Sequence, residues 1–242
     1  MKTLFLLIAF ATPLLAGFDH SHALFTEVLE KHAKGNEFDY AALDKDPDKL
    51  GAYLVDLSEV SRSEYNGWQE TQRKAFLINL YNASTLKLII DNYPLKGIKD
   101  IGSPWKQKQV KIFGGAVSLD HIEHGMLRKD FNDPRIHFAI NCASVGCPAL
   151  RSEAFRAPVL DTQFGEQARK FLGDSSKNRV DAKGGVLYLS SIFDWFEGDF
   201  VKKSGAVEKF IAPYLSEADR KAVLSGDLKI RHTDYDWSLN KP

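Results

Sequence analysis

The residues best suited to chemistry are concentrated in one stretch of the chain. Both cysteines, Cys142 and Cys147, occur there with three of the seven histidines, His121, His124 and His137. A cysteine that opens a loop of small residues can be exposed in a cleft, and a nearby imidazole can lower the pKa of its thiol. One interpretation is therefore thiol chemistry, with Cys142 as the nucleophile and His124 or His137 as the base.

Thiol catalysis needs a third side chain that orients the base, and three residues are candidates for that role: Asn79, Asn141 and Asp194. In such an enzyme Cys142 attacks the substrate and the histidine carries the proton. The first hypothesis is accordingly a cysteine-dependent hydrolase or acyltransferase that acts on an amide, peptide or cell-envelope substrate.

Two other interpretations of the same residues remain open. The two cysteines are separated by four residues and can form a disulfide that closes a short loop, provided that the chain is exported. The protein would then be a non-enzymatic binding or scaffold module. Alternatively, His121 and His124 share a helical face and could join a zinc-dependent hydrolase site. Their spacing matches no HExxH or paired CxxC pattern, so no metal ligands and no cofactor are assigned.

Acidic and aromatic residues alternate in two segments that could line a ligand cleft, residues 192–200 and 233–240. Asp194 and Asp236 stand among the rings. A carboxylate that is buried beside aromatic rings is costly unless it is paired, so we expect each to have a specific partner. Arg135 and His137 are the candidate partners.

The segments that must position these residues are mainly helical. Apolar spacing predicts helices at residues 23–32, 47–57, 70–92, 118–128, 161–174, 191–203, 207–215 and 216–224. A hairpin is predicted at 109–118 around Gly114-Gly115, with strands at 135–141 and 186–189 and an irregular tail. This order argues for an α+β fold, in which a mainly helical single domain carries a small antiparallel sheet.

The ends and the charge of the chain limit its partners. Residues 1–16 contain a positive charge, an apolar run and a final small residue, in the order typical of a signal peptide. We therefore expect a soluble periplasmic or secreted protein with one globular domain at 17–242. Basic and acidic residues both number 32, which argues against nucleic acid as a partner. No apolar run reaches the ~20 residues of a membrane span. The expected partner is a small-molecule or peptide ligand.

Four sequence motifs follow one another along the chain, at residues 76–83, 118–124, 135–150 and 235–240. Together they resemble those of the domain-of-unknown-function family 547. The resemblance implies a shared fold and a shared polar cluster without an established reaction. It also implies that the matching residues can meet in one site: Asn79, Asn82, Glu123, His124, His137 and Cys142.

A distant similarity to papain-like or transglutaminase-like thiol enzymes is a further alternative. In those enzymes the nucleophile usually opens a core helix, whereas the predicted helix at 70–92 contains no cysteine. The candidate catalytic residues are therefore Cys142, His124, His137, Asn79 and Glu123. The candidate binding residues are Asn82, Arg135, Asn141, Asp194, Asp236 and Trp237.

Overall fold

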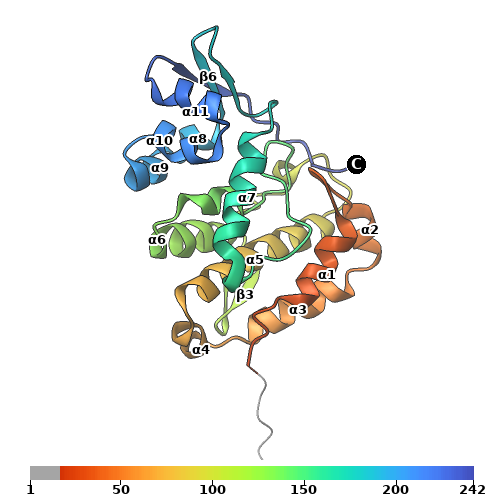
Figure 1. Ribbon diagram of the computed structural model, residues 1–242. Coiled ribbons are helices and arrows are strands. Elements are labelled where there is room, and N and C mark those ends of the chain that lie inside the picture. The colour runs from red at the N-terminus through yellow and green to blue at the C-terminus, as the bar shows by residue number, and fades with distance from the viewer. Residues whose placement is uncertain (1–16) are drawn as a thin grey trace, which may run out of the picture.

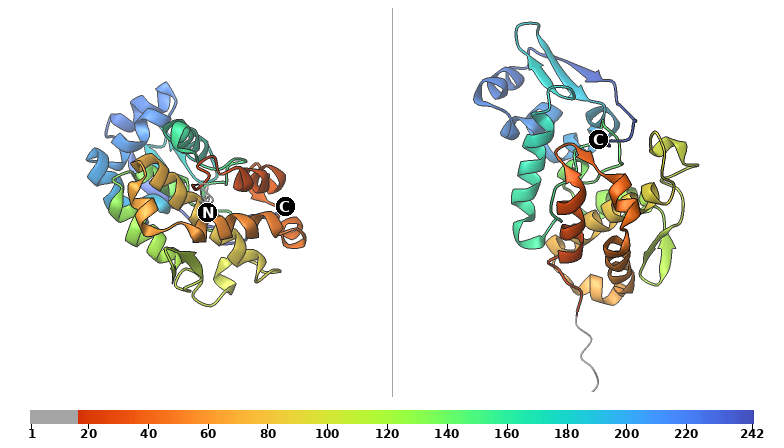
Figure 2. Two further views of the ribbon diagram at one scale, coloured as in Figure 1. Left: turned by 90° about the horizontal axis from the view of Figure 1, so that it is seen from below. Right: turned by 90° about the vertical axis from the view of Figure 1, so that its right-hand side faces the viewer.

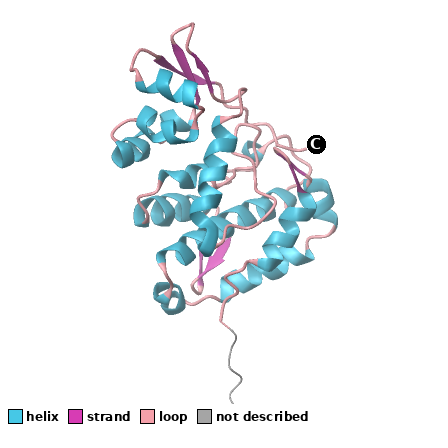
Figure 3. Cartoon of the chain, viewed as in Figure 1, coloured by secondary structure: helices cyan, strands magenta, loops and turns pink. Residues whose placement is uncertain are grey.

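The computed structural model describes residues 17–242, so the predicted signal peptide lies outside the described residues. The α+β class with a helical majority is confirmed, since helices form most of the chain and the strands form small sheets (Figure 3). A membrane-spanning segment was not expected, and no helix in residues 17–242 is long and apolar enough to be one.

The helices are α1 (Ala23–His32), α2 (Tyr40–Lys45), α3 (Asp48–Glu59), α4 (Arg62–Gly67), α5 (Glu70–Ile90), α6 (Arg128–Asp130), α7 (Leu160–Leu172), α8 (Ile192–Trp195), α9 (Glu197–Ser204), α10 (Val207–Ile211) and α11 (Glu217–Leu224). The strands are β1 (Ala33–Lys34), β2 (Glu37–Phe38), β3 (Val110–Ile112), β4 (Gly115–Val117), β5 (Arg179–Asp181), β6 (Val186–Ser190) and β7 (Lys229–Thr233). Strands β1–β2 and β3–β4 are antiparallel pairs, and β6 pairs antiparallel with β5 and parallel with β7.

Helix α5 is the centre of the larger of two apolar clusters (Figure 1). Its side chains are buried on nearly every face, as its all-round apolar sequence predicts. A reciprocal capping box between Gln69 and Gln72 satisfies backbone groups at its start. The helix ends before Tyr93-Pro94, because proline cannot donate the next helical hydrogen bond.

The second apolar cluster belongs mainly to the C-terminal part of the chain and is rich in phenylalanine. Phe193, Phe200 and Phe210 pack around Phe138 between β6 and helices α7, α9 and α10. Two further views show this part at one end of the molecule, with the last residues running back to the N-terminal helices (Figure 2). There the Tyr40 hydroxyl donates to Asn240 Oδ1 at 2.6 Å. This hydrogen bond anchors the last residues of the chain to α2.

The predicted hairpin is confirmed as β3–β4, but its turn begins one residue earlier than expected. Ile112 pairs with Gly115, so Phe113 and Gly114 are the central residues, with φ angles of 55° and 74°. Positive φ at both positions is what a type I′ turn requires. A positive φ is uncommon for phenylalanine. The Arg62 guanidinium packs over the Phe113 ring, 3.7 Å from the ring centroid.

The strand predicted at 135–141 is wrong, because Pro134–Phe138 form a 3₁₀ helix. Pro134 occupies its first turn, and the Asp133 side chain accepts a hydrogen bond from the Arg135 backbone. Residues 136–141 are all buried, so their alternation of polar and apolar types does not mark two faces of a strand. No strand within residues 17–242 pairs with them, and the Asn82 side chain instead forms hydrogen bonds to the backbone of Ala139 and Asn141.

Two further differences lie near the C-terminus. The helix predicted at 191–203 is divided into α8 and α9 at Phe196, whose ψ of 21° leaves the helical range. The tail predicted to be irregular contains β7, which pairs in parallel with β6. The largest sheet is therefore mixed. Only one residue of β7, Ile230, is strongly apolar, so the sequence pattern does not indicate a strand there.

Candidate functional site

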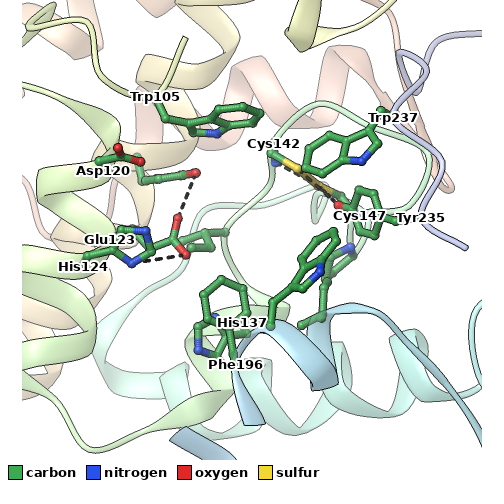
Figure 4. A pocket seen from close by; sticks show the side chains of 15 residues that line it. Trp105, Asp120, Glu123, His124, His137, Cys142, Cys147, Phe196, Tyr235 and Trp237 are labelled. Carbon is green, nitrogen blue, oxygen red and sulfur yellow. Dashed lines mark hydrogen bonds and ion pairs between the residues drawn. A yellow bond between two sulfur atoms is a disulfide. The ribbon is translucent and has the colours of Figure 1, made fainter. Parts of the chain in front are cut away.

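A pocket of about 690 Å³, counting the space at its mouth, lies where the two apolar clusters meet. Glu123 and His124 lie on one side of it, and Tyr235 and Trp237 lie on the other beside the two cysteines (Figure 4). The pocket therefore has an acidic wall and an aromatic wall.

The acidic wall comes from the helical segment at His121–Leu127, which has π-helical hydrogen bonding and continues into α6. A helix was predicted here, and Ser118 Oγ accepts the His121 backbone N–H at 3.1 Å near its start. Single π-helical turns often occur at functional sites, because the extra residue changes which side chains share a face. Here Glu123 and His124 both line the pocket, together with Asp120.

Glu123 is the central acid of the pocket. Its carboxylate accepts a hydrogen bond from the Tyr81 hydroxyl of α5 at 3.3 Å, and the residue is only 8% exposed. Burial raises the pKa of Glu123 to about 7, against the opposing effect of Arg128. The group can therefore gain or lose a proton near neutral pH.

Both candidate histidines line the pocket, and each already has a polar partner. Arg128 donates to His124 Nδ1 at 3.0 Å, which places the proton of neutral His124 on Nε2. His137 Nε2 lies 2.8 Å from the Asp199 carboxylate, which also accepts from Arg128 at 2.7 Å. Burial lowers the pKa of both histidines, and hydrogen bonds from His137 and Arg128 hold the pKa of Asp199 below its usual range.

The aromatic wall is built from segments far apart in the sequence. Tyr235 and Trp237 of the tail have ring centroids 4.6 Å apart, and Trp195 at the end of α8 lies 4.9 Å from Tyr235 and 5.7 Å from Trp237. Trp105 closes the wall edge-on to Trp237 at 5.7 Å. Rings from both predicted aromatic segments line this pocket, and Trp237 is one of them.

Cys142 and Cys147 form a disulfide on the same side of the pocket, as one of the sequence interpretations predicts. The Tyr235 hydroxyl lies 3.0 Å from Cys147 Sγ and 3.3 Å from Cys142 Sγ. Cys142 therefore has no free thiol in this structure. Within residues 17–242, no three His, Cys, Asp or Glu side chains are arranged to hold a metal ion.

The candidate asparagines do not line the pocket but hold its backbone, and we call them the asparagine framework: Asn79, Asn82 and Asn141. Asn82 of α5 donates to Ala139 O at 2.9 Å and accepts from the Asn141 backbone at 2.9 Å. The Asn141 side chain accepts a hydrogen bond from Ala143 N–H and donates one to Pro148 O, both at 2.7 Å, so it spans the disulfide loop. The Asn79 side chain donates a hydrogen bond to Phe155 O and accepts one from Phe155 N–H.

The remaining candidate residues lie outside the pocket. Arg135 pairs with Asp133 at 2.8 Å and with Asp161 at 2.6 Å. Asp194 and Asp236 are exposed to solvent, so the expectation that each is buried beside rings and paired with Arg135 or His137 is wrong. Rings adjacent in sequence point into the pocket while the acids between them point out.

Sequence reasoning missed several residues that shape the site. Tyr81 and Tyr235 each stand inside a motif of the chain, so the motifs themselves carried a signal for them. Asp199 and Arg128 had no such signal, because their roles depend on contacts with residues 62 and 71 positions away.

Comparison with known proteins gives one match. Residues 65–172 match the family described as "Protein of unknown function, DUF547". No curated protein and no solved structure matches the chain. The matched region includes α5, the acidic wall, the disulfide loop and α7, whereas the rings of Trp195, Tyr235 and Trp237 lie beyond it. The match is to the same family that the motifs resemble, and it covers residues 65–172 of the chain.

Proposed function

We propose that the protein binds a small organic cation in the pocket between the acidic and aromatic walls. One observation carries this proposal: the buried Glu123 carboxyl faces the pocket opposite the Tyr235 and Trp237 rings, and its ion-pair contact in the pocket lining is Nδ1 of His124 at 4.0 Å, an imidazole whose pKa burial lowers. Among the described residues that line the pocket there is neither lysine nor arginine. The proposed ligand supplies the missing positive charge.

The aromatic wall suits the same ligand. The faces of tryptophan and tyrosine rings attract organic cations, most strongly where water is excluded. Trp195, Tyr235 and Trp237 contact one another and present apolar area to the ligand. Because burial lowers the pKa of His124 and His137, the two imidazoles are neutral at pH 7 and do not repel a cation.

A thiol enzyme is the second candidate, and it concerns the reduced chain. Cys142 lines the same pocket as His124 and Glu123, which supports a cysteine-dependent hydrolase or acyltransferase once the disulfide is opened. Such an activity would require a reductant and would be abolished by Cys142→Ala. The oxidised chain has no thiolate to act as the nucleophile, so binding is the function we favour. A disulfide also suits the exported location that we propose.

Calorimetric titration of the oxidised protein tests the proposal with two cations, choline and benzyltrimethylammonium. The neutral isostere of choline, 3,3-dimethylbutan-1-ol, is the matched probe. We expect saturable binding of at least one cation and binding of the neutral alcohol at least ten-fold weaker than choline, since it lacks the charge that Glu123 recognises.

Variants separate the pocket from the rest of the surface. Glu123→Gln should weaken cation binding at least ten-fold, whereas Glu59→Gln, at the exposed end of α3, should leave it unchanged. Equal affinities for choline and its neutral isostere, or no saturable binding of either cation, would contradict the proposal.

A further inference from the structure

We propose that Cys142–Cys147 is a redox-active disulfide that accepts two electrons from a dithiol entering the pocket. The inference is independent of cation binding, because it rests on the surroundings of the two sulfur atoms. Those surroundings differ between the two cysteines.

One sulfur is accessible and the other is protected. Both cysteines line the pocket, but Cys142 is partly exposed, whereas Cys147 is only 4% exposed and its Sγ lies 3.0 Å from the Tyr235 hydroxyl. Gly146, beside Cys147, packs so closely on the Tyr235 ring that a Cβ there would lie 2.9 Å from it. Because exchange depends on access to the attacked sulfur, an incoming thiolate should attack Cys142 Sγ.

The protected sulfur is prepared to leave as a thiolate. Two donors converge on Cys147 Sγ at 3.0 Å, the Cys142 backbone N–H and the Tyr235 hydroxyl, while the Ser144 hydroxyl, 3.4 Å from the sulfur, donates to the Tyr235 oxygen at 3.2 Å. Burial raises the pKa of Tyr235 above its usual value, so its hydroxyl keeps the proton that it donates. Donors to a thiolate lower the pKa of its thiol, and a thiol of lower pKa leaves faster.

The exchange balances with a dithiol as the only co-reactant. One thiolate of the dithiol forms a bond to Cys142 Sγ, the Cys142–Cys147 bond breaks, and its electron pair remains on Cys147 as a thiolate. The second thiolate then attacks the first dithiol sulfur and releases Cys142. The protein gains two electrons and the two thiol protons, and the dithiol becomes a disulfide.

The loop does not depend on the disulfide for its shape. Tail carbonyls accept from the loop backbone, Ser238 O from Val145 N–H at 2.9 Å and Asp236 O from Gly146 N–H at 2.8 Å. Lys177 Nζ donates to Cys147 O at 3.0 Å, and the Asn141 side chain spans the loop. A disulfide that closes so short a loop removes little chain entropy from the unfolded state. The reduced chain should therefore remain folded.

Reduction of the full, native chain is the first test. With millimolar dithiothreitol we expect the intact mass to rise by two hydrogens while the circular dichroism spectrum stays native, and glutathione disulfide should restore the original mass. An acid quench early in the reaction should trap the mixed disulfide on Cys142, located by peptide mapping. A disulfide that resists dithiothreitol until the chain is denatured, or a mixed disulfide on Cys147, would overturn the proposal.

Three variants test the roles of the two sulfurs and their donor. Cys147→Ala leaves a free thiol at Cys142, and Cys142→Ala leaves one at Cys147. The Cys142 thiol should react with 5,5′-dithiobis(2-nitrobenzoate) at least ten-fold faster than the Cys147 thiol. Tyr235→Phe keeps the ring but removes a donor, so the Cys147 thiolate of the reduced chain should form at higher pH, followed by its ultraviolet absorbance. Tyr188→Phe on β6 is the matched control. An unchanged thiolate pH profile in Tyr235→Phe contradicts the proposed leaving group.

Discussion

The asparagine framework and Glu123 of the acidic wall are all buried polar residues within the motifs of the chain, but their hydrogen bonding differs. In the framework, Asn82 uses its amide as donor and acceptor toward backbone groups, and Asn79 does the same with Phe155. In the acidic wall, Glu123 accepts one hydrogen bond, from Tyr81, and otherwise faces the pocket. A buried side chain whose polar groups are all used supports structure, whereas one that is only partly used is free to meet a ligand.

The disulfide loop shows how the two regions cooperate. Asn82 and Asn141 hold the backbone on both sides of the loop, while the loop presents Cys142 to the pocket. Framework variants should therefore change stability, and variants of the acidic wall should change binding and pH dependence.

The largest effect is expected for Asn82→Ala. The substitution leaves Ala139 O and Asn141 N–H buried without a partner, and each such group costs about 1–3 kcal/mol. We expect the free energy of unfolding to fall by about 4 kcal/mol, measured by urea denaturation. Asn92→Ala, which removes only a partly buried hydrogen bond to Leu88 O, should cost less than about 1 kcal/mol. Similar losses for both variants would show that Asn82 is not a framework residue.

The next effect is a pH dependence that belongs to Glu123. Its pKa is about 7 in the folded chain against an ordinary 4.5, so the folded state binds the extra proton between these two pH values. The contribution of Glu123 to the free energy of unfolding therefore decreases as pH rises from 4.5 to 7, and then stays constant. The glutamine side chain of Glu123→Gln cannot ionise. Relative to the wild type, the free energy of unfolding of this variant should therefore rise by about 3 kcal/mol as pH increases from 4.5 to 7.

Urea denaturation at several pH values measures this difference. Glu59→Gln is the control, because Glu59 is exposed and its curve should parallel that of the wild type. A constant difference between Glu123→Gln and the wild type would mean that Glu123 does not titrate abnormally.

The smallest effect is expected for Asp194→Asn. Sequence reasoning placed Asp194 in the site, whereas its side chain is exposed beside Trp195. The substitution should change the free energy of unfolding by less than about 0.5 kcal/mol and leave choline affinity unchanged in calorimetry. A large loss of affinity would extend the acidic wall to α8.

The elements that could be predicted from the sequence are those whose signals are local. Helix α5 is apolar all round, and the β3–β4 hairpin has one glycine in its turn and one directly after it, so both elements are found within one or two residues. Strand β7 and the 3₁₀ helix at Pro134–Phe138 depend on partners elsewhere in the chain, β6 for the first and Asn82 for the residues after the second.

The site divides in the same way. The density of cysteine and histidine indicated the pocket region, and the spacing of the cysteines indicated a possible disulfide. Asn79 and Glu123 could not be assigned separate roles, because their hydrogen-bond partners Phe155 and Tyr81 are 76 and 42 residues away. Whether a buried polar residue is satisfied depends on partners far along the chain, and the motifs do not show which residues meet.

The most direct test of the central claim uses the four tryptophans of the chain. Trp105, Trp195 and Trp237 line the pocket, whereas Trp68 packs against Phe18 and Phe76, with ring centroids 5.4 and 5.2 Å away. In a proton–nitrogen correlation spectrum of the indole groups, choline should shift the three pocket resonances and leave that of Trp68 in place. Pocket resonances that stay fixed at saturating choline, or a Trp68 resonance that moves with them, would contradict the binding site described here.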